Sequence, residues 1–412
     1  MSEFKEIFKL ADILLPSNSL SEDFSVYPVI ACDQHTSEPE YWSEVSRIVG
    51  DDPSTLNMII PEIYLDKADE KTPLIHSAMR NYEDELLTEY RNTMILCERT
   101  QADGRIRQGI VCALDLEAYD FAPESKAYVR ATEGTVLSRI PARVAVRRGA
   151  SLELPHVMLL INDPELSVIE PEFTHKHALR KVYDTDLMLG GGHITGFVPS
   201  ERGGAFFMRR LNELANRCGD TFFSVAVGDG NHSLASAKAR FEEIKNEYGA
   251  EAAMEHPLRY ALCEVVNIYS PALDFEPIHR IIYGISRDDF ENALFEFNSG
   301  YSGEKYTLKA VTNGKPFNIS LPKNKSMSVA VLTDFLDTLA DSRKDIEIDY
   351  IHGDGTLISL SDNGGIGIFC DKMEKSALFE AVGKDGPLPR KTFSMGHACD
   401  KRYYIEARKI NI

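Results

Sequence analysis

The chain has 412 residues, enough for two or three packed units, and its 43% hydrophobic and 26% charged residues are typical of a soluble globular protein. A formal net charge of -19 repels phosphate backbones and anionic lipid, so we expect neither nucleic acid nor a membrane as a partner. Seven scattered cysteines without a Cys-x-x-Cys pair indicate reduced thiols. With no signal peptide or membrane span recognisable, we expect a cytoplasmic protein.

The spacing of apolar residues predicts a mixed α+β fold of the α/β class, with central mixed sheets and flanking helices. In chain order the expected elements are a helix at 41–49, a helix at 72–92, a hairpin over 93–121, a strand at 156–165, a helix at 205–218 and a strand at 256–270. Asp103-Gly104 supplies the turn of the hairpin. We place these elements in a main domain over residues 1–295.

A smaller α/β unit is expected over residues 296–412, with a tail that packs back on the main domain. Its predicted elements are a helix at 327–342, strands at 345–353 and 365–370, and a helix at 374–384. A Gly-Asp-Gly sequence at Gly353 is expected in a hairpin loop because turn-forming residues surround it.

Two glycines, a carboxylate, an amide and an imidazole separate a predicted strand from a predicted helix in the stretch SVAVGDGNHSLASAKA. These residues are Gly228, Asp229, Gly230, Asn231 and His232, followed by Ser233. Glycines permit positive φ and let a ligand approach the backbone, and the first N–H groups of a helix lack partners. A strand, a glycine turn and a helix N-terminus together form a site for phosphate or another anion.

The same residues also have a purely structural interpretation, which spacing alone does not exclude. Asn231 would then cap the helix, Asp229 would accept turn amides and His232 would be an ordinary first-turn residue. In the functional interpretation, Asp229 holds Mg²⁺ or accepts a proton, and His232 donates to a phosphate oxygen. The glycines fit neither a Walker A loop nor the Gly-x-Gly-x-x-Gly motif.

The turn resembles the signature of DUF1015, a family of unknown function in which an apolar strand runs into Asp-Gly-His-His-Arg. Four more segments are similar to parts of that family, in order along nearly the whole chain: GRIRQGIVCALDLEAYDF, VRATEGTVLSRIPARVAVRR, SPALDFEPIHRII and LPRKTFSMG. Asp-Gly-His-His-Arg also resembles the phosphate-binding motif of the ParB/sulfiredoxin superfamily, which includes a free serine kinase. That resemblance implies a nucleotide phosphate at the turn, although Asn231 replaces the first His and Ser233 replaces the Arg.

Losing the arginine at position 233 removes a bidentate phosphate donor, so either another cation replaces it or the ligand differs. Our first choice is Arg130 with Thr132 and Glu133, which occupy the basic segment of the family. Arg139 and Arg143 are four residues apart and share a helix face if that segment is helical. The alternative for these arginines is a solvated basic surface.

Two further basic segments are candidates. His279 and Arg280 could complete the site across the fold, or they are a buried histidine and a salt-bridged arginine. A C-terminal tail containing Arg390, Lys391, Lys401 and Arg402 could fold back over an anion site, or it is an ordinary basic edge strand.

A recognition segment is expected near the N-terminus, where hydrogen-bonding side chains lie close to the only tryptophan. Its residues are Asp33, Gln34, His35 and Trp42. An aromatic ring beside polar groups suits a small polar substrate. The alternative is a packed turn that anchors the N-terminus.

These observations favour ATP-dependent phosphoryl transfer to a small hydroxylated metabolite, with free serine as the leading substrate by analogy. ATP and Mg²⁺ are the expected cofactors, and Asp229 and His232 the expected catalytic residues, with Asp229 as metal ligand. Two alternatives stay open. One is a nucleotide- or metabolite-binding regulator without turnover, which Asn231 and Ser233 favour because they replace ionisable residues. The other is a hydrolase of a phosphate ester or nucleotide.

Overall fold

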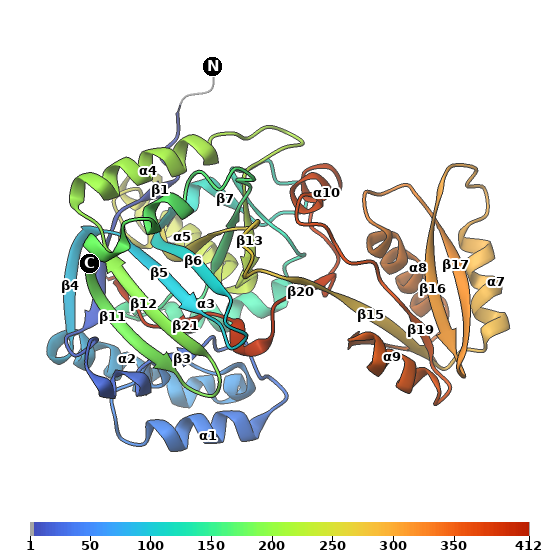
Figure 1. The fold of residues 1–412 in the computed structure, drawn as a ribbon, viewed down its shortest axis with the longest axis horizontal. Coiled ribbons are helices and arrows are strands. Elements are labelled where there is room, and N and C mark those ends of the chain that lie inside the picture. Colours follow the sequence, from blue (N-terminus) through green and yellow to red (C-terminus); the bar gives the residue numbers. More distant parts are fainter. Residues whose placement is uncertain (1–3, 412) are drawn as a thin grey trace. The chain divides into compact units, whose positions relative to one another are not determined.

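The computed structural model describes residues 4–411, which form two compact units (Figure 1). The first unit runs through Ala131, resumes over Thr135–Leu273 and takes up the chain again from His397. The second unit holds Thr132–Gly134 and Asp274–Gly396. The chain thus leaves the first unit at Leu273, ahead of the change expected near residue 295. No helix of residues 4–411 is long and apolar enough to span a bilayer.

A ten-stranded mixed sheet forms the centre of the first unit. Its order is β11 (Arg180–Leu187), β12 (Gly192–Val198), β5 (Ile95–Thr100), β6 (Ile106–Asp115), β14 (Tyr260–Asn267), β10 (Met158–Ile161), β13 (Val225–Asp229), β8 (Val129–Ala131) and β7 (Tyr119–Asp120), with β1 (Phe8–Lys9) beside β6. Its central strands are near-continuous apolar runs because both faces of the sheet are covered. The predicted fold class and the β5–β6 hairpin, with Gly104 at φ 83°, are confirmed.

Six α-helices of the first unit are α1 (Pro39–Val49), α2 (Ala68–Glu85), α3 (Ile140–Arg147), α4 (Glu201–Ala215), α5 (Asn231–Tyr248) and α6 (Ala250–Ala253). Helix α5 buries Leu234, Phe241 and Ile244 in the main core. The helix expected over 72–92 is too long. It ends at Glu85, and Leu87–Thr93 forms strand β4, which pairs with β2 (Ala11–Pro16).

Two short ribbons fix the end of the chain in the first unit. Strand β21 (Tyr403–Tyr404) pairs with β3 (Val29–Ile30), and β22 (Arg408–Lys409) pairs with β9 (Leu152–Glu153). The first pairing places the residues before Tyr403 beside the residues after Ile30.

The second unit is a six-stranded sheet with four helices. The sheet order is β17 (Lys315–Pro322), β16 (Lys305–Thr312), β19 (Ile366–Ile368), β15 (Phe275–Tyr283) and β18 (Glu347–His352), with β20 (Phe393–Met395) beside β15. The helices are α7 (Arg287–Phe297), α8 (Ser328–Ser342), α9 (Asp354–Ser361) and α10 (Ala377–Asp385). The hairpin loop expected at Gly353 is wrong, because Gly353, at φ 81°, joins strand β18 to helix α9.

Candidate functional site

The turn between β13 and α5 is a single residue. Strand β13 ends at Asp229, Gly230 has φ 77° and ψ 27°, and α5 begins at Asn231. This confirms the predicted strand-to-helix turn. A Cβ at Gly230 would lie 3.0 Å from Cα of Val157 and 3.2 Å from Cδ2 of His156. Glycine is therefore required both by the left-handed backbone and by the close approach of the chain that enters β10.

Two neighbours of this turn differ from expectation. Gly228 lies within the strand and does not have positive φ; its added Cβ would lie 2.6 Å from Cγ of Leu160, so packing explains the glycine. Asn231 is the first residue of the helix rather than its cap, which is Gly230. The Oδ1 atom of Asn231 is buried without a hydrogen-bond partner within residues 4–411, and an amide oxygen so placed is a candidate ligand contact.

Asp229 carries two interactions at the start of α5. Its Oδ1 accepts a hydrogen bond from the Gly230 N–H (3.0 Å), and its Oδ2 lies 3.3 Å from Nζ of Lys401. The side chains of Lys401 and Asp229 are 14% and 20% exposed. The cap residue of α5 is Gly230, which makes no side-chain cap hydrogen bond, and the positive end of the helix dipole lies next to Asp229. A cation, a carboxylate and a helix N-terminus thus meet at one place.

A second carboxylate lies next to this pair. Nε2 of His156 is 3.8 Å from Oδ2 of Asp33, and Gln34 Nε2 donates to Asp33 Oδ1 at 3.0 Å. Burial raises the pKa of Asp33, but the charge of His156, the hydrogen bond from Gln34 and the charge of Lys401 outweigh it, so that the pKa is lowered. Asp33 is therefore ionised at neutral pH.

The backbone explains how these side chains meet. The Ala31 N–H donates to the Arg402 carbonyl (2.8 Å), which continues the β3–β21 pairing by one residue in the direction of Asp33 and Lys401. Arg402 Nε donates to the Pro155 carbonyl (2.8 Å), directly before His156. We therefore define the polar site as Asp33, His156, Asp229, Lys401 and the first turn of α5.

Sequence reasoning singled out Asp33 and Asp229, and it placed Lys401 in a tail that could fold back. It missed His156. His156 lies just before the apolar strand β10. A polar residue at the end of a buried strand was the signal that could have identified it, as it did for the residues that follow β13.

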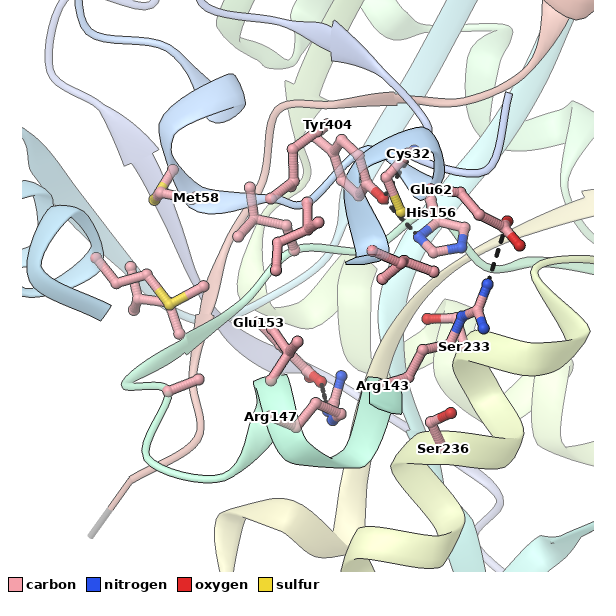
Figure 2. Close-up of a pocket in the computed structure, with 18 residues that line it drawn as sticks. Cys32, Met58, Glu62, Arg143, Arg147, Glu153, His156, Ser233, Ser236 and Tyr404 are labelled. Carbon is pink, nitrogen blue, oxygen red and sulfur yellow. Dashed lines mark hydrogen bonds and ion pairs between the residues drawn. The ribbon is translucent and has the colours of Figure 1, made fainter. Parts of the chain in front are cut away.

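A cavity of about 140 Å³ opens beside the first turn of α5 (Figure 2). Ser233 and Ser236 of α5, His156, Cys32 and Tyr404 contribute to its lining. A hydrogen bond of 2.8 Å joins Tyr404 Oη to Nδ1 of His156. Burial raises the pKa of Cys32 to about 12, so this residue is a neutral thiol rather than a nucleophile.

The arginines that share this cavity with Ser233 are Arg143 and Arg147, not Arg130. Arg139, the residue before α3, and Arg143 on α3 both pair with Glu62, at 3.4 and 3.1 Å.

The guanidinium of Arg130 has other partners, although Arg130 lies on β8 beside β13. It donates to the carbonyls of Ala127, Gly219 and Asp220 and covers the ring of Phe223. These contacts hold the loop that leads into β13, at the end of the strand remote from Gly230. Arg130 is buried there as a structural residue, which corrects its expected place in the phosphate site.

His232 is held by the chain that enters α3, since its Nε2 accepts the Val136 N–H at 3.1 Å. Thr132 and Glu133 belong to the second unit. There the Thr132 carbonyl accepts a hydrogen bond from the Leu388 N–H (2.8 Å), and the backbone of Glu133 forms an isolated β-bridge with Leu388.

His279 and Arg280 also belong to the second unit. His279 is buried, with Nδ1 accepting the Cys370 N–H and Nε2 2.9 Å from Asp354 of the second Gly-Asp-Gly turn. Arg280 lies over the ring of Tyr350, with its guanidinium carbon 4.5 Å from the ring centre. His279 is therefore a buried structural histidine, which was the second of the two interpretations considered for it.

The N-terminal recognition segment divides into two parts. Asp33 and Gln34 reach the polar site, as described above. Trp42 is fully buried and donates through Nε1 to the Gln34 carbonyl (3.3 Å), so it supports the segment from the core instead of contacting a ligand. His35 stacks on Tyr41 at 3.6 Å and pairs with Glu38.

The comparisons with known proteins place the chain in a family without assigning an activity. A conserved hypothetical protein from Pyrococcus furiosus is similar at 8% identity and a TM-score of 0.36, covering 73% of this chain and 95% of that one. A mutant free serine kinase in complex with ADP is similar at 11% identity and a TM-score of 0.40, covering 73% and 92%. SbnI with a C-terminal truncation, from Staphylococcus aureus, is similar at 10% identity and a TM-score of 0.35, covering 68% and 84%.

None of the curated proteins matches the chain. The model of the family described as a protein of unknown function (DUF1015) matches residues 14–342. Because this match spans most of the sequence, the chain belongs to the DUF1015 family.

Proposed function

We propose that the polar site binds the phosphates of a nucleotide and transfers a phosphoryl group to a small hydroxylated metabolite. The observation that carries this proposal is the ion pair of Lys401 and Asp229 at the uncapped N-terminus of α5. An uncapped helix start offers backbone N–H donors, and an ammonium group adds a full positive charge. Lys401 takes the role of the arginine that the motif lacks at position 233.

The two carboxylates have separate roles in this proposal. Asp229 orients the ammonium of Lys401 and, through Gly230, the start of α5. Asp33 is ionised and lies beside His156, so it accepts the proton of the attacking hydroxyl. Phosphoryl transfer depends on positioning and on charge stabilisation, and this group of residues supplies both.

Mg²⁺ fits this site only as an ion that the nucleotide carries. Within residues 4–411, no three His, Cys, Asp or Glu side chains are grouped closely enough to hold a metal. Both oxygens of Asp229 already have partners. An oxygen of Asp229 would therefore reach the ion only by exchanging its present partner, and the ion would neutralise phosphate charge, as is common for Mg²⁺ bound to nucleotide phosphates.

The experiment is incubation of the protein with ATP labelled in the γ-phosphate, Mg²⁺ and a pool of hydroxylated metabolites that includes serine. We expect a labelled product that forms only when the pool is present. Release of phosphate without the pool would indicate a hydrolase. A thermal shift with ATP but no labelled product would indicate a nucleotide-binding regulator, and either result would contradict phosphoryl transfer to a metabolite.

A further inference from the structure

The cavity beside the polar site has a polar end and an apolar end. His156, Ser233 and Cys32 belong to the polar end, and Met58 lies on the other side of the cavity (Figure 2). The apolar part of the wall consists of Ile60, Leu65, Met79, Val146, Ala150 and Leu152, and charged side chains also border the cavity. Methionine side chains adapt readily to an apolar guest, and Met58 and Met79 are both in this wall.

The charged side chains at the cavity already have partners. Arg143 pairs with Glu62 at 3.1 Å, and Arg147 pairs with Glu153 at 2.6 Å. Glu153 is also bound by Arg408 at 2.7 Å. The charges at this end are therefore paired, although the buried Nε–H of Arg147 has no hydrogen-bond partner within residues 4–411. A purine or a sugar placed there would lose its hydrogen bonds to water, whereas a hydrocarbon group would gain from leaving water.

The cavity and the polar site share His156. Its ring lines the cavity, its Nε2 faces Asp33 at 3.8 Å, and its Cδ2 lies against Gly230. Ser233 also lines the cavity from the first turn of α5. A molecule with its hydrocarbon group in the cavity would therefore present an attached hydroxyl group to Asp33 and to the start of α5.

We propose that the phosphate acceptor is an alcohol with an aliphatic or aromatic hydrocarbon group, and that this group occupies the cavity. The proposal rests on the function proposed above and narrows its substrate class. In phosphoryl transfer, the hydroxyl oxygen of the acceptor forms a bond to the γ-phosphorus, the bond to the β–γ bridging oxygen breaks, ADP leaves, and Asp33 takes the hydroxyl proton. Free serine, which has no hydrocarbon group to fill the cavity, is then a poor acceptor.

The test measures binding of ethanol, 1-butanol and 1-hexanol by ligand-observed NMR, first without nucleotide. Burial of one methylene group is worth about a fourfold gain in affinity, so binding should strengthen stepwise along the series. Equal binding of the three alcohols would overturn the proposal. The same titration with saturating ATP shows whether the cavity holds a hydrocarbon group or the nucleotide base. We expect 1-hexanol to bind in the presence of ATP. Displacement of 1-hexanol by ATP would mean that the nucleotide base occupies the cavity.

Two variants locate the binding. Ala150→Leu and Val146→Phe each place added carbon atoms in the cavity from a different element, and either one that keeps its melting temperature should lose at least tenfold in 1-hexanol affinity. Ala205→Leu, on the exposed face of α4, is the matched control and should bind as the parent does. Unchanged 1-hexanol binding in a folded cavity variant would overturn the assignment. If the alcohols bind as expected but ATP does not bind, the cavity assignment stands and the phosphoryl-transfer function fails.

Discussion

Lys401 and Asp229 form an ion pair at the start of α5, with 3.3 Å between Nζ and Oδ2, although they come from opposite ends of the second half of the chain. The pair exists because the tail returns to the first unit and pairs β21 with β3. A glycine turn that lacks the arginine of its family motif thus acquires a cation from a distant segment.

Replacing Asp229 by Asn should abolish turnover and leave the fold intact. Asn keeps the shape and can still accept the Gly230 N–H, but it no longer holds the charge of Lys401. We expect a loss on the order of a thousandfold in kcat, since each ~1.4 kcal/mol of transition-state stabilisation is tenfold in rate. The check is kcat beside the melting temperature. Asp354→Asn, in the Gly-Asp-Gly turn of the second unit, is the control and should keep its activity. If the variant melts at a lower temperature and its activity falls only in proportion to the fraction of folded protein, Asp229 is a structural turn residue.

Replacing Arg402 by Met should destabilise the first unit strongly. The buried Arg402 guanidinium pairs with Glu264 and, at 2.5 Å, with Glu406. Removing it leaves two buried carboxylates without their main partner, which costs about 3–5 kcal/mol in comparable cases. The measurement is the free energy of unfolding in urea. Arg209→Met, which removes an exposed pair with Glu213 on α4, should cost under about 1 kcal/mol. Equal effects of the two substitutions would show that the buried network does not stabilise the tail.

Glu153 should make stability depend on acid pH. Burial raises its pKa, but the charges of Arg408 and Arg147 and the hydrogen bonds outweigh it, so the pKa lies below the ordinary 4.5. A carboxyl with a depressed pKa in the folded state contributes stability that is present above pH 4.5 and is lost as the pH falls through the folded pKa.

Unfolding free energies of the parent and of Glu153→Gln, measured from pH 7 down to pH 3, test this. The variant should be less stable at pH 7, and the difference should shrink on acidification. Glu291→Gln, in an exposed pair with Arg287, is the control and should show no such change. A difference that is constant over this pH range would rule out the linkage.

The elements that sequence reasoning predicted well are those set by local patterns. Gly230 and Gly104 mark turns whose backbone only glycine adopts easily, and apolar spacing fixed β13 and α5 around the first of them. Strand β4 was missed because its pairing with β2 overrides a helical pattern that continues past Glu85.

The polar site depends on contacts that no local pattern encodes. Asp33 meets Lys401 through strands of two residues each, which carry no recognisable period. Arg130 was misplaced because its neighbours in sequence say nothing about the carbonyls of Gly219 and Asp220, which surround its guanidinium. The choice between a ligand-binding and a structural arginine is made by tertiary structure.

Nucleotide binding by a protein that lacks the Lys401 charge tests whether the start of α5 holds phosphate. Calorimetric titration with ATP and Mg²⁺ should show at least tenfold weaker binding for Lys401→Met than for the parent, since an ammonium-to-phosphate contact is lost. Lys409→Met, which removes an ammonium paired with Glu83 on the same tail, should bind ATP as the parent does. Equal affinity of the two variants, both folded, would contradict a phosphate site at the start of α5.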